Sequence, residues 1–160
     1  MRFYLCVVAF IAGLAVHSIA AQSQNRGVVR VNHVGIAVED LDAAVSYYTE
    51  TLGFPEAFRV VGDSGQPVLV YVQVSRETFV ELQPANPQRP PGMTHFGLQV
   101  EDMNAVSNAL RERGASVSAT RSGSTKAILA NVTDPNGVTI ELSELPPDSL
   151  QAEAIARWRD

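Results

Sequence analysis

The sequence predicts an α+β domain made of two tandem β-α-β-β-β modules. The prediction starts from an internal repeat, because residues 32–41 read NHVGIAVEDL and residues 94–103 read THFGLQVEDM. His, Gly, Val, Glu and Asp coincide at one offset of 62 residues. A helical pattern and three apolar β runs follow each copy. Self-similarity over such a distance indicates a duplicated structural unit.

The first strand of each module alternates in polarity. His33 shares one face with Gly35 in the first module, and His95 shares one face with Gly97 in the second. The opposite face of each strand is apolar, so we expect it to pack against the helix that follows. The two histidines then lie on the face that points away from the helices.

A helix is expected after each of these strands. Asp40 and Asp102 are the expected N-caps, and Gly53 and Gly114 suit the C-terminal ends, where glycine tolerates the left-handed conformation. Residues at helical spacing form an apolar stripe in each helix. The stripes are Leu41, Ala44, Val45, Tyr48 and Leu52 in the first helix, and Met103, Val106 and Leu110 in the second.

Three apolar runs in each module are expected to form the remaining strands. These runs are 56–61, 67–74 and 78–83, and then 116–120, 126–133 and 138–143. The expected boundaries are module one at 28–84, a proline-rich linker at 84–92, module two at 93–145, and one domain over 28–145. The tail, 146–160, is expected to contain a short helix capped by Asp148 or Ser149.

Residues 1–21 have the pattern of a secretory signal peptide. Arg2 precedes the apolar run 5–16, and the small residues 18–21 offer a cleavage site. A membrane anchor is the alternative, but the run is short for a span of about 20 residues and His17 interrupts it. We therefore expect an exported protein, periplasmic or secreted, that has no membrane attachment after cleavage.

The composition limits the classes of function. Cys6 is the only cysteine and lies in the expected signal peptide, so we expect no disulfide in the exported chain. The chain has 12 basic and 17 acidic residues, for a formal charge of −5, and no run of Lys or Arg. This balance argues against nucleic acid as a partner. Only two histidines, His33 and His95, lie beyond the expected signal peptide.

Two glutamates also fall at equivalent places in the modules. Glu81 and Glu141 lie 60 residues apart, and each stands between apolar residues in the last strand of its module. A half-buried carboxylate is costly unless a cation compensates it, and two are worse. Two imidazoles and two carboxylates suit Zn²⁺, Ni²⁺, Co²⁺, Mn²⁺ or Fe²⁺. We therefore predict a divalent metal site formed by His33, Glu81, His95 and Glu141.

Other polar residues are candidates for contact with a substrate. Tyr71 and Gln73 alternate along one strand of the first module, and Lys126 and Asn131 lie in the related stretch of the second. Each of them has a solvated strand face as its alternative environment. Arg59 and Arg121 are candidates for contact with an anionic substrate, with the same alternative.

Several segments between Val31 and Glu144 carry a family resemblance. They are His33–Val38, Tyr47–Phe54, Phe79–Leu82, His95–Gly97 and Asp134–Leu142. Together they resemble the vicinal oxygen chelate superfamily, which includes glyoxalase I, methylmalonyl-CoA epimerase, extradiol dioxygenases, and fosfomycin- and bleomycin-resistance proteins. The resemblance implies that the strands curl into a cupped sheet around one metal, which keeps open positions for two adjacent substrate oxygens. It also implies a small-molecule substrate with vicinal oxygens, and a possible homodimer.

Within this superfamily the His-Glu-His-Glu set resembles glyoxalase I most. That resemblance implies a lyase or isomerase in which the metal-bound oxygens acidify the adjacent C–H and stabilise an enediolate. Glu141 or Glu81 then moves the proton, with Glu141 favoured. Three features depart from glyoxalase I. Ala37 stands where that enzyme commonly has an Arg that contacts glutathione, and the first strand equally resembles methylmalonyl-CoA epimerase, which usually has Gln in place of Glu81. The third is the expected export, because glutathione and CoA thioesters are chiefly cytosolic.

Three classes of function therefore remain open. The first is metal-assisted proton abstraction next to a carbonyl, of the glyoxalase I type or of the epimerase type. The second is Fe²⁺ dioxygenase chemistry, which the four-ligand set and the short chain oppose. The third is an exported module that binds a small molecule or confers resistance without catalysis, as relatives of the bleomycin-resistance type do without metal ligands.

Overall fold

The computed structural model describes residues 27–159. The predicted signal peptide, residues 1–21, lies outside them. Among the described residues, no helix has the length and apolar character needed to cross a membrane.

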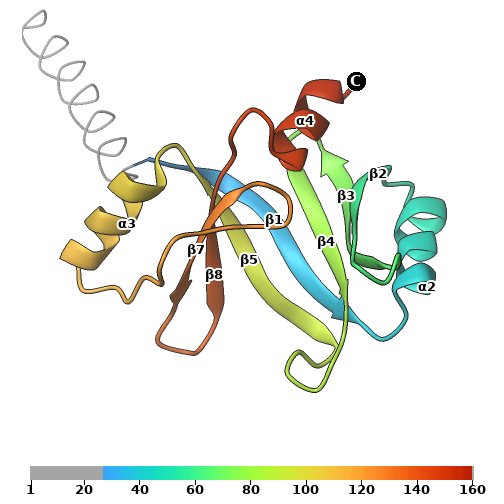
Figure 1. Cartoon of the computed structure of the whole chain (residues 1–160), viewed down its shortest axis with the longest axis horizontal. Helices are drawn as coiled ribbons and strands as arrows, with labels where there is room; N and C mark the ends of the chain where they lie inside the picture. Colours follow the sequence, from blue (N-terminus) through green and yellow to red (C-terminus); the bar gives the residue numbers. More distant parts are fainter. Residues whose placement is uncertain (1–26, 160) are drawn as a thin grey trace, which may run out of the picture.

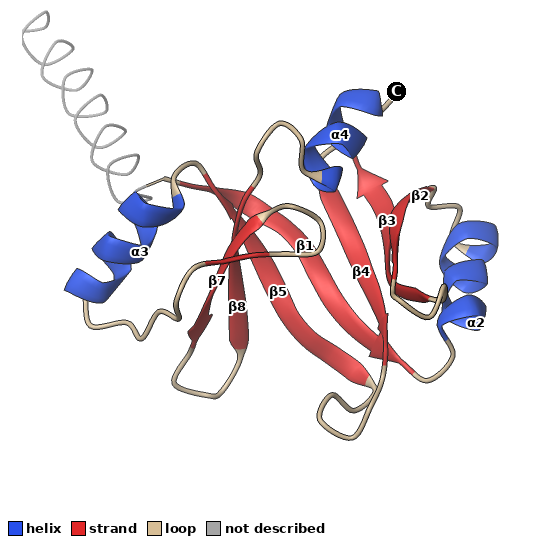
Figure 2. Cartoon of the chain, viewed as in Figure 1, coloured by secondary structure: helices blue, strands red, loops and turns tan. Residues whose placement is uncertain are grey.

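Both modules follow the predicted β-α-β-β-β order (Figure 2). Module one contains β1 (Val28–Val38), α2 (Leu41–Ser46), the π-helical turn η1 (Tyr47–Thr51), β2 (Glu56–Val61), β3 (Pro67–Ser75) and β4 (Thr78–Pro84). Module two contains β5 (Gly92–Val100), α3 (Met103–Glu112), β6 (Arg121–Ser122), β7 (Ile128–Thr133) and β8 (Thr139–Glu144). The tail forms α4 (Leu150–Arg157), which begins after its cap Ser149.

All of these strands form one mixed sheet in the order β2-β3-β4-β1-β5-β8-β7-β6. The first strand of each module pairs in parallel with the last strand of the same module, and β1 pairs with β5 in antiparallel fashion to join the modules. The sheet curls, and α2 and α3 lie outside it at opposite flanks (Figure 1). The predicted α+β fold with a cupped mixed sheet and outer helices is confirmed.

The helices begin and end at the predicted residues, with one exception. The Asp40 carboxylate accepts from Ala43 N–H, and Asp102 accepts from Ala105 N–H in the same way. After Ser46, however, the chain forms the π-helical turn η1, which is wider than an α-helical turn and puts later residues out of α-helical register. Leu52 is consequently 43% exposed instead of packing with the apolar stripe.

The predicted strand at 116–120 is wrong. Val117 forms only an isolated bridge with Val132, and β6 is a two-residue strand at Arg121–Ser122. The guanidinium of Arg111 on α3 donates to the backbone carbonyls of Val117 and Ser118. The Arg111 side chain thus supplies these carbonyls with hydrogen bonds that a neighbouring strand would otherwise donate.

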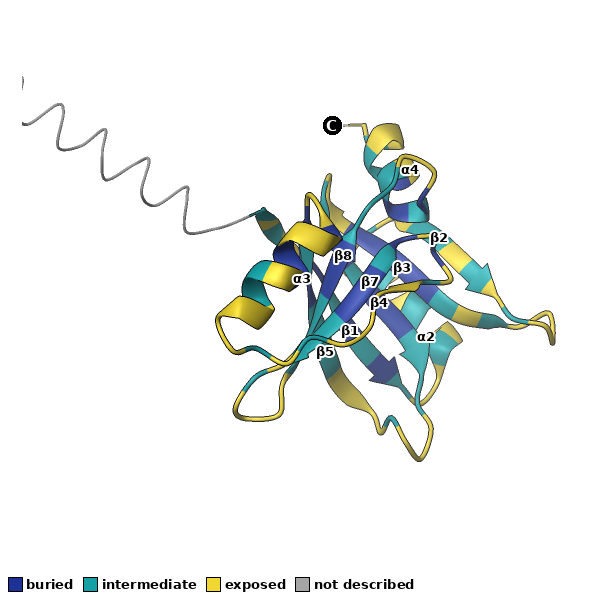
Figure 3. Cartoon of the chain, turned by 60° about the vertical axis from the view of Figure 1, so that its left-hand side comes forward, coloured by how far each residue is buried: buried dark blue, intermediate teal, exposed yellow. Residues whose placement is uncertain are grey.

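The core lies mainly between the sheet and α3, whose outer face is exposed (Figure 3). Its buried residues are Val100, Met103, Val106, Ala130 and Leu142. A second cluster, under α4, contains Tyr71, Phe79 and Ala154.

Candidate metal centre

The antiparallel register of β1 and β5 brings the two histidines together. His33 stands opposite Gly97, and His95 stands opposite Gly35. A Cβ atom on Gly97 would overlap the His33 ring, and a Cβ atom on Gly35 would overlap the His95 ring. The glycine of each His-x-Gly repeat therefore makes room for the imidazole of the other module. As a result the two Nε2 atoms lie 3.0 Å apart.

The second nitrogen of each imidazole is held by a neighbouring side chain. His33 Nδ1 lies 3.0 Å from Asn32 Oδ1, while Asn32 Nδ2 donates to the carbonyl of Glu77. Because an amide oxygen only accepts, His33 Nδ1 carries the proton and Nε2 presents a lone pair. His95 Nδ1 lies 2.9 Å from Thr94 Oγ1. Such bonds orient imidazoles for metal ligation.

Glu81 completes a triangle of ligand atoms. Its Oε2 lies 3.7 Å from His33 Nε2 and 3.8 Å from His95 Nε2. The point equidistant from the three atoms is about 2.1 Å from each, which is the length of a bond from Zn²⁺ to nitrogen or oxygen. Burial lowers the pKa of His95, which favours the neutral ring that a metal requires. These residues therefore fit a divalent cation, and their mixed N/O ligation does not select one metal.

Glu81 also has one buried and neutral hydrogen-bond partner, Tyr71. The Tyr71 hydroxyl donates to Glu81 Oε2, and Tyr71 is 2% exposed. Burial of the phenol, followed by the negative charge of Glu81, raises the pKa of Tyr71 well above its usual value. Tyr71 therefore stays protonated and remains a hydrogen-bond donor to this carboxylate.

The equivalent glutamate of module two has a charged partner instead. Glu141 Oε1 lies 3.5 Å from His33 Nε2, and Glu141 Oε2 accepts from Arg121 Nη2 at 3.0 Å. Burial alone would raise the pKa of Glu141, but its hydrogen-bonding and cationic neighbours, which include Arg121, lower it. The Glu141 carboxylate is thus ionised at neutral pH and lies beside the ligand triangle.

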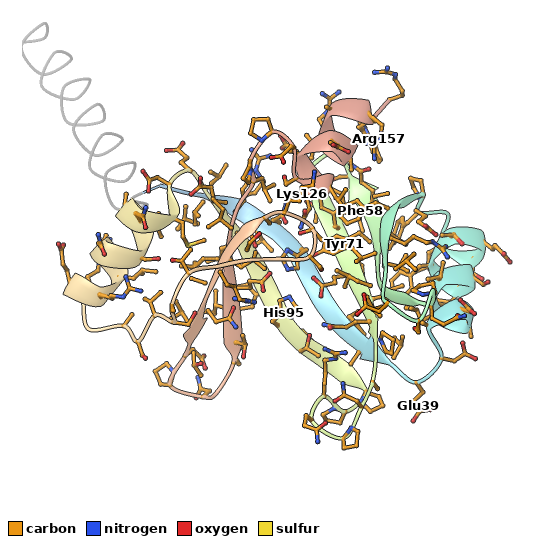
Figure 4. The ribbon with its side chains drawn as sticks, in the orientation of Figure 1. Glu39, Phe58, Tyr71, His95, Lys126 and Arg157 are labelled. Carbon is orange, nitrogen blue, oxygen red and sulfur yellow. The ribbon has the colours of Figure 1, made fainter. Side chains whose placement is uncertain are left out.

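A cavity of about 640 Å³ opens onto these side chains. Tyr71 and His95 project from β3 and β5 toward the middle of the concave face (Figure 4). Glu81 and Glu141 also line the cavity, and its further polar lining residues include Arg89, Thr125, Asn131 and Gln151. Because polar side chains from both modules and from α4 surround it, the cavity suits a small polar ligand.

The comparison with protein families agrees with this architecture. The model of the Glyoxalase/Bleomycin resistance protein/Dioxygenase superfamily matches residues 30–142, a range that includes both histidines and both glutamates. The chain belongs to this superfamily. The resemblance predicted from the repeated His-x-Gly segments is therefore confirmed.

Several of the similar proteins are epimerases. The chain is 28% identical over 133 residues to an ethylmalonyl-CoA/methylmalonyl-CoA epimerase of Cereibacter sphaeroides, which covers 72% of this chain and 98% of that protein. The crystal structure of methylmalonyl-CoA epimerase from Mycobacterium tuberculosis matches with a TM-score of 0.66 at 28% identity, over 75% of this chain and 90% of that chain. A Streptomyces coelicolor methylmalonyl-CoA epimerase shares the fold, with a TM-score of 0.64 at 23% identity, over 76% of this chain and 98% of that chain. These relatives favour the epimerase alternative over the glyoxalase I prediction.

Three of the other predicted residues line the cavity of about 640 Å³. Tyr71 contacts Glu81, as described above. Asn131 lines the cavity and its Oδ1 lies 3.5 Å from Arg121 Nη1. Arg121 reaches the site from β6, next to the stretch in which a longer strand was expected.

The other three predicted residues lie elsewhere. The Gln73 amide donates to the carbonyl of Arg76, and Gln73 lines a smaller cavity beside α4. Lys126 has 61% of its side chain exposed and points to Asp148. Arg59 forms an ion pair with Glu56 within β2.

Sequence reasoning missed the residues that hold the ligands in place. Asn32 and Thr94 each precede a histidine, so the repeat itself contained a signal for them. The function of Gly35 and Gly97 depends on the pairing of β1 with β5, which the repeat does not specify. Gln151 lies in the tail, where no pattern pointed to the site.

Proposed function

We propose that the protein is a metal-dependent enzyme that removes and returns a proton at a carbon next to a carbonyl. The observation that carries the proposal is the difference between two equivalent glutamates. Glu81 belongs to the ligand triangle and has the neutral partner Tyr71, whereas Glu141 lies beside the triangle and has the cationic partner Arg121. One carboxylate is arranged to hold a metal, and the other is arranged to accept a proton.

In this proposal His33, His95 and Glu81 hold a divalent cation, which supplies the Lewis acidity that makes the substrate C–H acidic. Glu141 is the base. Arg121 holds Glu141 Oε2, which leaves Oε1 as the oxygen that takes the proton. Glu141 then returns the proton to the same carbon. Glu81 keeps its place in the ligand triangle and accepts the hydrogen bond of Tyr71.

The substrate class that we propose is a 2-substituted malonyl thioester. The named substrates of relatives, ethylmalonyl-CoA and methylmalonyl-CoA, support this choice. Arg89 and Arg121 line the cavity and suit the free carboxylate of such a substrate. A lyase of the glyoxalase I type is the second candidate, because Glu81 completes a His-Glu-His-Glu set. Export of the chain and a homodimer remain proposals that cell fractionation and light scattering test.

The experiment is proton exchange in D₂O, followed by NMR. The protein, loaded with Co²⁺ or Zn²⁺, is incubated with methylmalonyl-CoA and separately with the hemithioacetal of methylglyoxal and glutathione. We expect loss of the α-proton signal of methylmalonyl-CoA, and a rate that falls by about 10²–10⁴-fold in Glu141→Gln. Glu101→Gln, which changes an exposed residue after β5, is the matched control. Absence of exchange with both substrates would overturn the proposal, as would an undiminished rate in Glu141→Gln.

A further inference from the structure

The C-terminal helix α4 lies beyond the range 30–142 that matches the superfamily, yet it packs against the site. Ala154, which is 2% exposed, belongs to one buried cluster with Tyr71. The backbone N–H of Leu150 donates to the carbonyl of Thr125 at 3.0 Å. The helix is thus attached to both modules, through β3 and through the loop between β6 and β7 (Figure 1).

Gln151 is the residue that α4 contributes to the cavity wall. It is 1% exposed and lines the same cavity as Tyr71 and Glu81. The Gln151 amide and the Tyr71 hydroxyl line the same cavity, and hydrogen bonding by Gln151 is among the causes that act on the pKa of Tyr71, which it lowers. Gln151 Oε1 has no hydrogen-bond partner among the described residues. Because a buried amide oxygen without a partner is costly, packing alone does not account for a glutamine at this position.

The direction of these hydrogen bonds follows from their chemistry. The Tyr71 hydroxyl has one proton, and it donates that proton to Glu81 Oε2. Toward Gln151 the hydroxyl therefore acts as acceptor, and the Gln151 Nε2–H group is the donor. A chain of hydrogen bonds runs from α4 to the carboxylate oxygen that faces both histidines.

We propose that Gln151 is a positioning residue, which acts through Tyr71 to fix Glu81 for metal ligation, so that α4 is part of the metal site. The inference rests on the proposed function, since it requires Glu81 to be a ligand. In module one Tyr71 stands opposite Glu81, whereas in module two the residue opposite Glu141 is Asn131. The partner of Glu141 is Arg121, whose side chain is 47% exposed. The hydrogen-bond chain from the tail is therefore specific to Glu81.

The test is Co²⁺ binding by the protein and four variants. Gln151→Leu and Gln151→Glu remove the amide donor in two ways, Tyr71→Phe removes the middle of the chain, and the double variant Gln151→Leu/Tyr71→Phe closes the cycle. The matched control is Arg157→Ala, which removes a bond from α4 to the carbonyl of Ala57 but leaves Gln151 intact. Dissociation constants come from chelator competition, and the visible absorption of bound Co²⁺ reports the ligand geometry.

We expect Tyr71→Phe to weaken Co²⁺ binding by about 10–100-fold, and the Gln151 variants to weaken it by roughly 3–10-fold with an altered absorption band. The double variant should match Tyr71→Phe alone, because both residues act in one chain. Arg157→Ala should leave affinity and spectrum unchanged. If both folded Gln151 variants bind like wild type, or if the effects add in full, the inference is wrong and the proposed function stands. If the wild-type protein binds no Co²⁺, both are wrong.

Discussion

Replacement of Gly97 by alanine tests how the two modules build one site. The added methyl group would occupy space that the His33 ring fills. His33 is 0% exposed and is held by Asn32, so the ring has no solvent-filled space into which it can move. Overpacking of this kind costs about 1–3 kcal/mol, which corresponds to roughly 3–12 °C in Tm for a domain of this size.

The effect on metal binding should be larger than the effect on stability. Any displacement of the ring moves His33 Nε2 out of the triangle that it forms with His95 and Glu81. Loss of a metal ligand lowers the affinity more than loss of a hydrogen bond to a ligand does. We therefore expect the affinity for Zn²⁺ or Co²⁺ to fall by more than about 100-fold. Gly35→Ala should act in the same direction but less strongly, because the His95 side chain is 11% exposed.

The assay combines thermal unfolding without metal and chelator competition with it. Gly62→Ala is the control, since its added methyl group meets the Val68 side chain at 2.8 Å and neither imidazole. That variant should bind metal like wild type. A Gly97→Ala protein that binds metal within twofold of wild type would refute the register argument, because the ring would then not need the space above Gly97.

Three further perturbations address charge and metal. Arg121 lowers the pKa of Glu141, so Arg121→Gln should raise that pKa and move the acid limb of the exchange rate to higher pH. The backbone N–H of Val138 is the main cause that lowers the pKa of Asp134 below 3.8. Asp134 therefore stabilises the fold fully above the pKa of its unfolded state, and this contribution is lost as the pH falls through the lower pKa of the folded state. In Asp134→Asn the free energy of unfolding, measured with urea, should therefore fall less steeply between about pH 5 and pH 2. Finally, free metal at 100 times its dissociation constant should stabilise the protein by about 2.7 kcal/mol, and Glu81→Ala should abolish this gain.

Each of these expectations has a contrary result. An acid limb that does not move in Arg121→Gln would mean that Glu141 is not the titrating base. If the free energy of unfolding falls equally steeply with acid in wild type and Asp134→Asn, the carboxylate of Asp134 does not contribute to the pH dependence of stability. Equal stabilisation of Glu81→Ala and wild type by metal would place the ion elsewhere.

The repeat alone predicted most of the architecture, because both copies keep the same alternation of polar and apolar residues at nearly the same distance in sequence. His33 and His95 share an offset of 62, and the glutamates share an offset of 60, so the four residues were expected on one face before any fold was known. The limits were equally physical. The register shifts along β1 and β5 decide which glycine meets which ring, and they depend on bulges that no local pattern reveals. Arg111 replaced a strand partner at residues 117–118, which local β propensity cannot predict.

The duplication makes the two modules alike, whereas the proposed proton transfer requires that their glutamates differ. Two equivalent carboxylates with the same partners would compete for one role, and neither would be preferred as ligand or as base. In the first module β3 places Tyr71 beside Glu81, whereas β7 of the second module has Asn131 at that place and β6 brings Arg121. A buried neutral donor keeps Glu81 in one position. An exposed cation holds Oε2 of Glu141, whereas Oε1 accepts only a long bond of 3.5 Å from the Ser143 hydroxyl. The tail then strengthens the difference, because α4 contacts Tyr71 and has no counterpart on the side of Glu141 among residues 27–159.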